Sequence, residues 1–152
     1  MHSPVLLVLL PLAGAGLALV GKLVPPRLAV VKQLFAVTAV LPLGGMTVVL
    51  AGTLAEIHGG EILESTLGGW PEPHGITLRL DGFAWLSSAL IVLISVMVIM
   101  AAFSRWASRE GAYGPVFFFF LMTLIAGMAM VTLTGDIFTM FVAFEIVAIA
   151  AY

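Results

Sequence analysis

The chain alternates between long apolar stretches and short polar turns. A helix needs about 20 predominantly apolar residues to cross the hydrocarbon core of a bilayer, and stretches near that length recur along the sequence. They cover residues 4–20, 28–54, 82–103, 115–133 and 136–152. This pattern predicts an all-α integral membrane protein with about five transmembrane helices, the last one incomplete. No hydrophilic block is long enough to fold separately, so residues 1–152 are expected to form a single membrane domain.

The longest polar segment, residues 55–81, is predicted to lie on the membrane surface. Its charged residues are acidic apart from Arg79. From Ile76 onward apolar and polar residues alternate, which is the period of a half-buried strand. A small surface hairpin is therefore expected in this loop, with Trp70 and Trp85 at the depth of the membrane interface.

Proline and glycine interrupt the second apolar stretch. Pro42 removes a backbone hydrogen bond and crowds the preceding turn, so a kink is expected there. Gly44 and Gly45 follow it. Small residues let helices approach closely, so these glycines predict close helix packing, with a functional hinge as the alternative.

Composition agrees with a membrane protein and narrows the chemistry. Charged residues make up 9% of the chain, against about 25% in soluble domains. The absence of cysteine excludes disulfides, thiolate metal sites and Cys-ligated iron–sulfur clusters. His2, His58 and His74 lack metal-ligand spacing, and no phosphate loop, nucleophile triad or nucleic-acid patch is present. We therefore expect no cofactor, no metal site, no nucleic-acid partner and no catalytic chemistry in this chain.

The basic residues predict the orientation in the membrane. Apart from Arg79, they lie at or just after the connection between the first and second stretches and at the connection between the third and fourth, namely Lys22, Arg27, Lys32, Arg105 and Arg109. The positive-inside rule then places the N-terminus, the acidic loop and the turn at 134–136 outside a cell membrane. Because the basic residues follow the first apolar run, that run favours a retained span over a cleaved signal peptide.

One carboxylate, Glu145, lies inside the fifth apolar stretch. Asp136 is expected to cap the start of this helix, and nine residues at about 1.5 Å each place Glu145 roughly 13 Å deeper. That is near the middle of a core about 30 Å thick. An ionised side chain there costs from about 2.5 to more than 10 kcal/mol, so it needs a partner, a water-filled cavity or a proton.

Two interpretations of Glu145 stay open. The functional hypothesis is a carboxylate in a proton path, and the alternative is a structural glutamate that is permanently protonated or hydrogen-bonded between helices. Asp136 is a weaker candidate for the same path. Tyr152 is another, because it follows Glu145 by seven residues and shares its helical face. An interfacial tyrosine is the equal alternative for Tyr152.

Two motifs resemble the antiporter-like membrane subunits. This family is shared by Mrp-type multisubunit cation/proton antiporters, membrane-bound hydrogenases and the membrane arm of respiratory complex I. The first motif is Gly68-Gly69-Trp70-Pro71 through Gly75-Ile76 to Asp81-Gly82. The second is Thr134-Gly135-Asp136-Ile137-Phe138 with Phe141 and Phe144-Glu145. The Phe-Glu pair resembles the Mrp D-type and hydrogenase branch more than the complex I branch, where Trp-Glu is usual.

The resemblance implies a larger subunit of about fourteen helices with two inverted five-helix repeats, each with a discontinuous helix. It also implies a line of polar residues at the membrane midplane, formed by a glutamate on the fifth helix and lysines on later ones. Only the glutamate carries over, onto Glu145, because no lysine follows Lys32. No basic or polar cap follows Tyr152, so the chain is expected to be the N-terminal part of a longer polypeptide, or a truncated product of one.

The expected function is transport. The chain is predicted to be part of a subunit of a multisubunit cation (Na⁺)/proton antiporter or a related proton-translocating complex, with Glu145 in the proton path. Its expected partners are the lipid bilayer, other membrane subunits and protons, with Na⁺ as a candidate cation. One alternative is a non-conducting structural or accessory subunit. Another is an antiporter-like subunit of a redox-driven complex of hydrogenase or NADH:quinone oxidoreductase type, in which partner proteins carry out the oxidoreductase chemistry.

Overall fold

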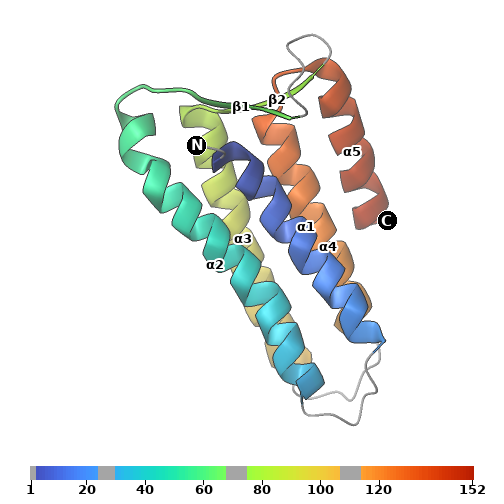
Figure 1. The fold of residues 1–152 in the computed structure, drawn as a ribbon. Helices are drawn as coiled ribbons and strands as arrows, with labels where there is room; N and C mark the ends of the chain where they lie inside the picture. The colour runs from blue at the N-terminus through green and yellow to red at the C-terminus, as the bar shows by residue number, and fades with distance from the viewer. Residues whose placement is uncertain (1–2, 24–29, 68–74, 107–113) are drawn as a thin grey trace.

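The computed structural model describes residues 3–23, 30–67, 75–106 and 114–152, whose arrangement Figure 1 shows. In chain order they form α1 (Ser3–Lys22), α2 (Val30–His58), β1 (Leu63–Leu67), β2 (Ile76–Leu80), α3 (Gly82–Trp106), α4 (Gly114–Leu133) and α5 (Ile137–Ala151). Helices α1 to α4 are long and apolar enough to cross a membrane, and α5 is a shorter apolar helix. The predicted fold class, an apolar helical bundle with a small hairpin, is confirmed.

Helix α2 continues beyond the predicted span, as far as His58. Hydropathy marks the apolar part of a helix, whereas the helix itself ends where its backbone turns. Here the turn is at Gly60, which has a φ of 83°, a conformation that glycine adopts readily because it has no Cβ. The N–H of Gly60 donates to the carbonyl of Ile57, and the N–H of Glu61 donates to that of Glu56. This pair of bonds closes a helix through a left-handed residue.

The helices pack closely where glycine allows it. In Figure 1, α1 lies between α2 and α4 and packs on both, α3 packs on α2 and α4, and α5 packs principally on α4. A Cβ at Gly45 of α2 would lie 2.9 Å from Cδ1 of Leu10 on α1, so close packing at Gly45 is confirmed. Gly44 instead faces open space. Helix α2 continues on both sides of Pro42, and the predicted kink stays a prediction.

The hairpin forms within the predicted loop. Strands β1 and β2 are antiparallel, with Leu63 opposite Leu80 and Ser65 opposite Leu78. The predicted alternation holds at Leu78 and Leu80, which are buried. It is wrong at Ile76, which is 39% exposed, and at Thr77, which is 4% exposed. Gly135, in the turn before α5, donates its N–H to the carbonyl of Thr77, and strand periodicity does not reveal such a neighbour.

Aspartate and tryptophan connect the hairpin to α3. Asp81 Oδ1 accepts the N–H of Ala84 at 2.8 Å, which satisfies a free donor of the first helical turn. This cap was not predicted, although an aspartate directly before an apolar stretch is its signal. Trp85 is half-buried, and its indole N–H donates to the carbonyl of Leu50 on α2 at 2.9 Å. Its predicted interfacial depth stays a prediction.

The two ends of the bundle differ in their connections. The N-terminal end of α1, the hairpin and the turn before α5 gather at one end, the top of Figure 1. The acidic residues of the described chain other than Glu145 lie there, namely Glu56, Glu61, Glu64, Asp81 and Asp136. The predicted residues outside the described part of the chain are His2, Arg27, Gly68, Gly69, Trp70, Pro71, Glu72, His74 and Arg109. The predicted topology requires the hairpin and the turn before α5 to lie at the same end of the bundle, and they do.

Candidate functional site

The candidate site begins at the turn that starts α5. Asp136 has extended backbone angles, and its Oδ1 accepts the N–H of Thr139 at 2.7 Å. The hydroxyl of Thr134 donates to the carbonyl of Asp136 at 3.2 Å and accepts its N–H at 3.4 Å. These bonds fix the direction in which α5 leaves the turn, and the predicted N-cap at Asp136 is confirmed.

The cap favours the ionised form of Asp136. Hydrogen bonds from the side chain and the backbone N–H of Thr139 hold the pKa of the Asp136 carboxyl below its ordinary value of 3.8, and partial desolvation opposes them. A carboxylate that accepts helix N–H groups is favoured in its charged form. The structure therefore shows a capping role for Asp136, whereas its weaker role in a proton path stays a prediction.

Substitution of Asp136 tests the cap. Asp136→Ala is expected to lower the free energy of unfolding by about 1 kcal/mol at neutral pH, and Asp136→Asn should keep most of it because asparagine also caps helices. Because the pKa of Asp136 is lowered in the folded state, its charge stabilises the fold fully at pH values above the ordinary pKa of 3.8. This stabilisation is lost as the pH falls through the folded-state pKa. Thermal unfolding in detergent at several pH values measures both effects. An alanine variant as stable as the wild type at neutral pH would contradict the cap.

Helix α5 packs on α4 through one face. Thr139 and Ala143 are its buried residues. A Cβ at Gly127 of α4 would lie 2.9 Å from Cγ2 of Val147 and 3.1 Å from Cγ2 of Ile146. The missing side chain at Gly127 thus allows the two backbones to approach, and it fixes which face of α5 meets α4.

Glu145 lies on the opposite face of α5. Successive helical residues are about 100° apart, so Glu145 is about 200° from both Ala143 and Val147. Its side chain is exposed and makes no hydrogen bond or ion pair with the residues that the structure describes. The carboxylate is therefore not buried among the described helices, and it points away from α4.

The face around Glu145 is apolar and aromatic. Phe138 and Phe141 share it and are 73% and 61% exposed. Tyr152 is also exposed, and its backbone N–H donates to the carbonyl of Ala148 at 3.2 Å. The spacing of Glu145 and Tyr152 places both on this side, as the sequence indicates, whereas their roles in proton transfer stay predictions.

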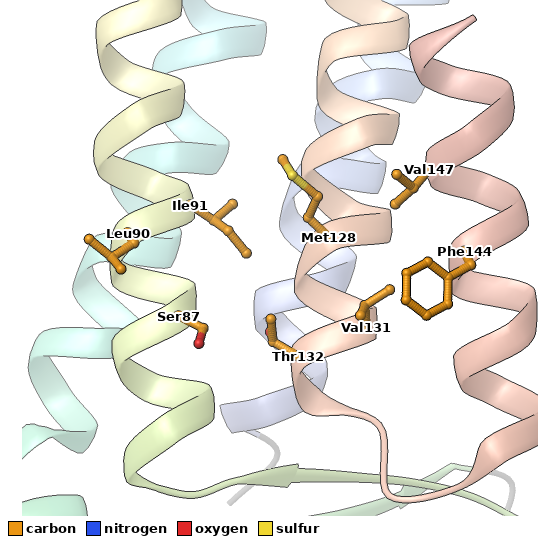
Figure 2. A pocket seen from close by; sticks show the side chains of 8 residues that line it. All are labelled: Ser87, Leu90, Ile91, Met128, Val131, Thr132, Phe144 and Val147. Atoms are coloured by element: carbon orange, nitrogen blue, oxygen red, sulfur yellow. The ribbon is translucent and has the colours of Figure 1, made fainter.

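A second feature lies on the neighbouring flank of α5. An open groove of about 340 Å³ lies between α3, α4 and α5, and Figure 2 shows the side chains that line it. It is lined by Ser87, Leu90, Ile91, Met128, Val131, Thr132, Phe144 and Val147. Apart from the hydroxyls of Ser87 and Thr132 the lining is apolar, and Glu145 is not part of it. The sequence analysis did not single out Ser87 or Thr132, whose signal is a hydroxyl inside an apolar span.

No metal centre is found among the described residues, where no three His, Asp or Glu side chains gather closely enough to hold an ion. The site that remains is one carboxylate in an apolar helix. It lies on a face that the described helices leave open, and a capped turn and a close contact with α4 hold it in place. Such a carboxylate can bind a proton or pair with a cation brought by another segment.

This fold is that of a multi-pass membrane protein, and the relatives of the chain are antiporter-like membrane subunits. The chain is 37% identical over 109 residues to the D-type subunit of the Na(+)/H(+) antiporter of Alkalihalophilus pseudofirmus, covering 71% of this chain and 22% of that protein. It is 36% identical over 157 residues to the N-type subunit of the NADH-quinone oxidoreductase of Desulforudis audaxviator, covering 99% of this chain and 29% of that protein. No protein-family model matches the chain.

A solved structure gives the same result. The membrane-bound sulfane sulfur reductase, an archaeal respiratory membrane complex, contains a chain that matches this one with a TM-score of 0.79 and 28% identity. The match covers 100% of this chain and 30% of that one. The family resemblance is therefore confirmed: the chain is a homologue of the antiporter-like membrane subunits over a part of their length.

Proposed function

We propose that this chain is part of a proton-conducting, antiporter-like subunit in a multisubunit membrane complex, and that Glu145 is a protonatable group in its proton path. The observation that carries the proposal is the position of Glu145. It is the one acidic side chain within α5, and it projects from the face opposite α4. Homology to antiporter subunits supports the same conclusion.

The physical reason is the cost of charge in hydrocarbon. An ionised side chain near the bilayer centre is unfavourable unless it is paired or solvated, so such residues are rare and typically functional. Apolar surroundings favour the protonated form of a carboxyl, whereas a nearby cation favours the ionised form. A carboxyl whose surroundings change can therefore accept a proton in one state and release it in another.

The open face of α5 supports a partner outside the described helices. The chain spans 22% and 29% of the two relatives, so most of their length has no counterpart here. Further helices of a longer subunit, or other membrane subunits of the complex, would cover the face around Glu145. The whole complex would exchange protons for a cation, with Na⁺ as the candidate because the Alkalihalophilus relative belongs to a Na(+)/H(+) antiporter.

The distribution of charge supports an orientation of the chain in a cell membrane. The hairpin end of the bundle is acidic, and the helix ends that carry Lys22, Lys32 and Arg105 are at the other end. By the positive-inside rule, the hairpin, the N-terminus and the turn before α5 would face outward. Glu145 would then lie on a helix that enters the membrane from outside.

A redox-driven complex is the second candidate. The NADH-quinone oxidoreductase relative and the sulfane sulfur reductase favour it, since both belong to respiratory complexes by name. Partner proteins would then carry out electron transfer, and this chain would contribute to proton movement. A non-conducting accessory subunit is the remaining alternative, in which Glu145 only pairs with a neighbouring helix.

Carbodiimide labelling tests the proposed role of Glu145. These reagents couple to protonated carboxyls in apolar surroundings, so in everted membrane vesicles that contain the complete complex we expect labelling to inhibit proton-coupled transport. Mass spectrometry should locate the adduct on Glu145. Complete inhibition with an unmodified Glu145 would contradict the proposal, as would a fully labelled Glu145 with unchanged transport.

A further inference from the structure

The turn before α5 is attached to the free edge of the hairpin. Leu78 of β2 and Thr134 form an isolated antiparallel bridge, and the N–H of Gly135 donates to the carbonyl of Thr77 at 3.0 Å. Strand β2 therefore has β1 on one edge and the turn on the other. An edge strand otherwise leaves a row of backbone groups unpaired, and here the turn uses part of that row.

Gly135 is the point of closest approach. A Cβ at this position would lie 3.2 Å from Cδ of Arg79 and 3.4 Å from the carbonyl oxygen of Thr77. The backbone of Gly135 does not have a positive φ, which among the described glycines occurs at Gly60. A side chain at Gly135 is therefore restricted by the neighbouring atoms and not by the backbone conformation. Arg79 is held in turn by Glu64 of β1, at 2.6 Å in an ion pair. The contacts thus run from β1 across β2 to the turn.

These contacts reach α5 directly. Asp136, the residue after Gly135, caps the first turn of α5. The hydroxyl of Thr134 donates to the carbonyl of Asp136 and accepts the N–H of Asp136. Elsewhere α5 packs principally on α4, where Gly127 meets Val147. The flank toward α3 is open, as the groove in Figure 2 shows. The contacts that hold α5 are therefore its packing on α4 and the attachment of its first turn to β2.

We propose that the hairpin is a fixed strut for α5, and that Gly135 is a positioning residue for Glu145. The carboxylate lies nine residues from Asp136, or about 13 Å along the helix, so a tilt of about 10° would move it by about 2 Å. Displacements of about 1 Å can slow a transfer step about a hundredfold. The expected effect of the strut on the transport rate rests on the proposed function of Glu145. Its effect on the position of Glu145 does not.

Gly135→Val tests the strut, with Gly82→Val as the matched control. Gly82 lies two residues after the end of β2, and a Cβ there would meet nothing within 4 Å. In the complete complex we expect Gly135→Val to reach the membrane, to change the rate of carbodiimide labelling at Glu145, and to reduce transport about tenfold or more. Gly82→Val should leave both unchanged. Wild-type labelling in Gly135→Val would overturn the strut.

The labelling rate separates this inference from the proposed function. If Glu145 has no role in transport, Gly135→Val still alters its labelling and the strut stands, while transport is unaffected by the change. If the strut is wrong, labelling at Glu145 stays at the wild-type rate even though the carbodiimide still inhibits transport. The two proposals therefore fail in different measurements.

A disulfide provides a test that does not depend on folding of the valine variant. Leu78 and Thr134 are a non-hydrogen-bonded antiparallel pair, for which the Cα atoms lie about 4.5 Å apart. That spacing suits a disulfide, and the chain has no cysteine of its own. We expect Leu78→Cys/Thr134→Cys to cross-link on oxidation, and transport by this variant to be the same in its oxidised and reduced forms. Failure to cross-link would overturn the pairing of Leu78 with Thr134. Loss of transport on oxidation that a reductant restores would show that β2 and the turn must separate during transport, and this result would also overturn a fixed strut.

Discussion

Replacing Glu145 with glutamine is expected to reduce proton-coupled transport by the complete complex about a hundredfold or more, since a positioned proton-transfer group typically contributes that much to a rate. Glutamine has nearly the same shape and keeps hydrogen-bonding capacity, but it does not titrate. The measurement is proton movement driven by a cation gradient in everted vesicles or proteoliposomes, normalised to the amount of assembled complex.

Two further variants define what that result means. Glu145→Asp keeps a titratable carboxyl, so part of the transport should remain. Glu61→Gln removes an exposed acidic residue at the hairpin end of the bundle and should have no effect. Transport by Glu145→Gln at the wild-type rate would remove Glu145 from the proton path and favour the accessory-subunit alternative.

Gly14→Ala is expected to cause the largest loss of stability from a single added methyl group. The new Cβ would lie 2.6 Å from Cγ of Pro42 and 2.9 Å from the backbone carbonyl oxygen of Thr38. Neither a proline ring nor a backbone carbonyl can rotate away, so α1 and α2 would have to separate. Overpacking of this kind costs about 1–3 kcal/mol and occasionally more. Unfolding of the purified protein in a denaturing detergent measures the loss.

Gly16 offers a matched control on the same helix. A Cβ there would meet nothing within 4 Å, and alanine is favoured over glycine in a helix by about 1 kcal/mol. Gly16→Ala should therefore be as stable as the wild type or more stable. If Gly14→Ala and Gly16→Ala have the same stability, the close contact between α1 and α2 is wrong.

Local signals in the sequence were sufficient for much of the fold. The apolar stretches predicted the helices because hydropathy over a window depends only on the residues within it. Asp136 was recognised as a cap because an N-cap bonds to residues two or three positions ahead in the same chain. The hairpin was predicted from the alternation between Ile76 and Asp81, which holds at Leu78, Arg79 and Leu80 but not at Ile76 and Thr77.

Long-range contacts explain what the sequence analysis missed. The turn at Gly135 pairs with Thr77 of β2 from a position 58 residues later in the chain, and this pairing has no periodic signal. Ser87 and Thr132 come together in the groove only because α3 and α4 pack side by side. The Asp81 cap was overlooked even though its signal, like that of Asp136, is local.

The sequence by itself determined that this protein is a bundle of apolar helices with a hairpin between the second and third, and that one acid, Glu145, lies within the fifth helix. These features depend on composition, periodicity and neighbouring residues. Only the tertiary structure decided which way that acid points. Helix α5 is apolar on every side, so its sequence has no polar face from which an orientation follows. The close approach at Gly127, on another helix, turns Ala143 and Val147 toward α4 and leaves Glu145 on the open face.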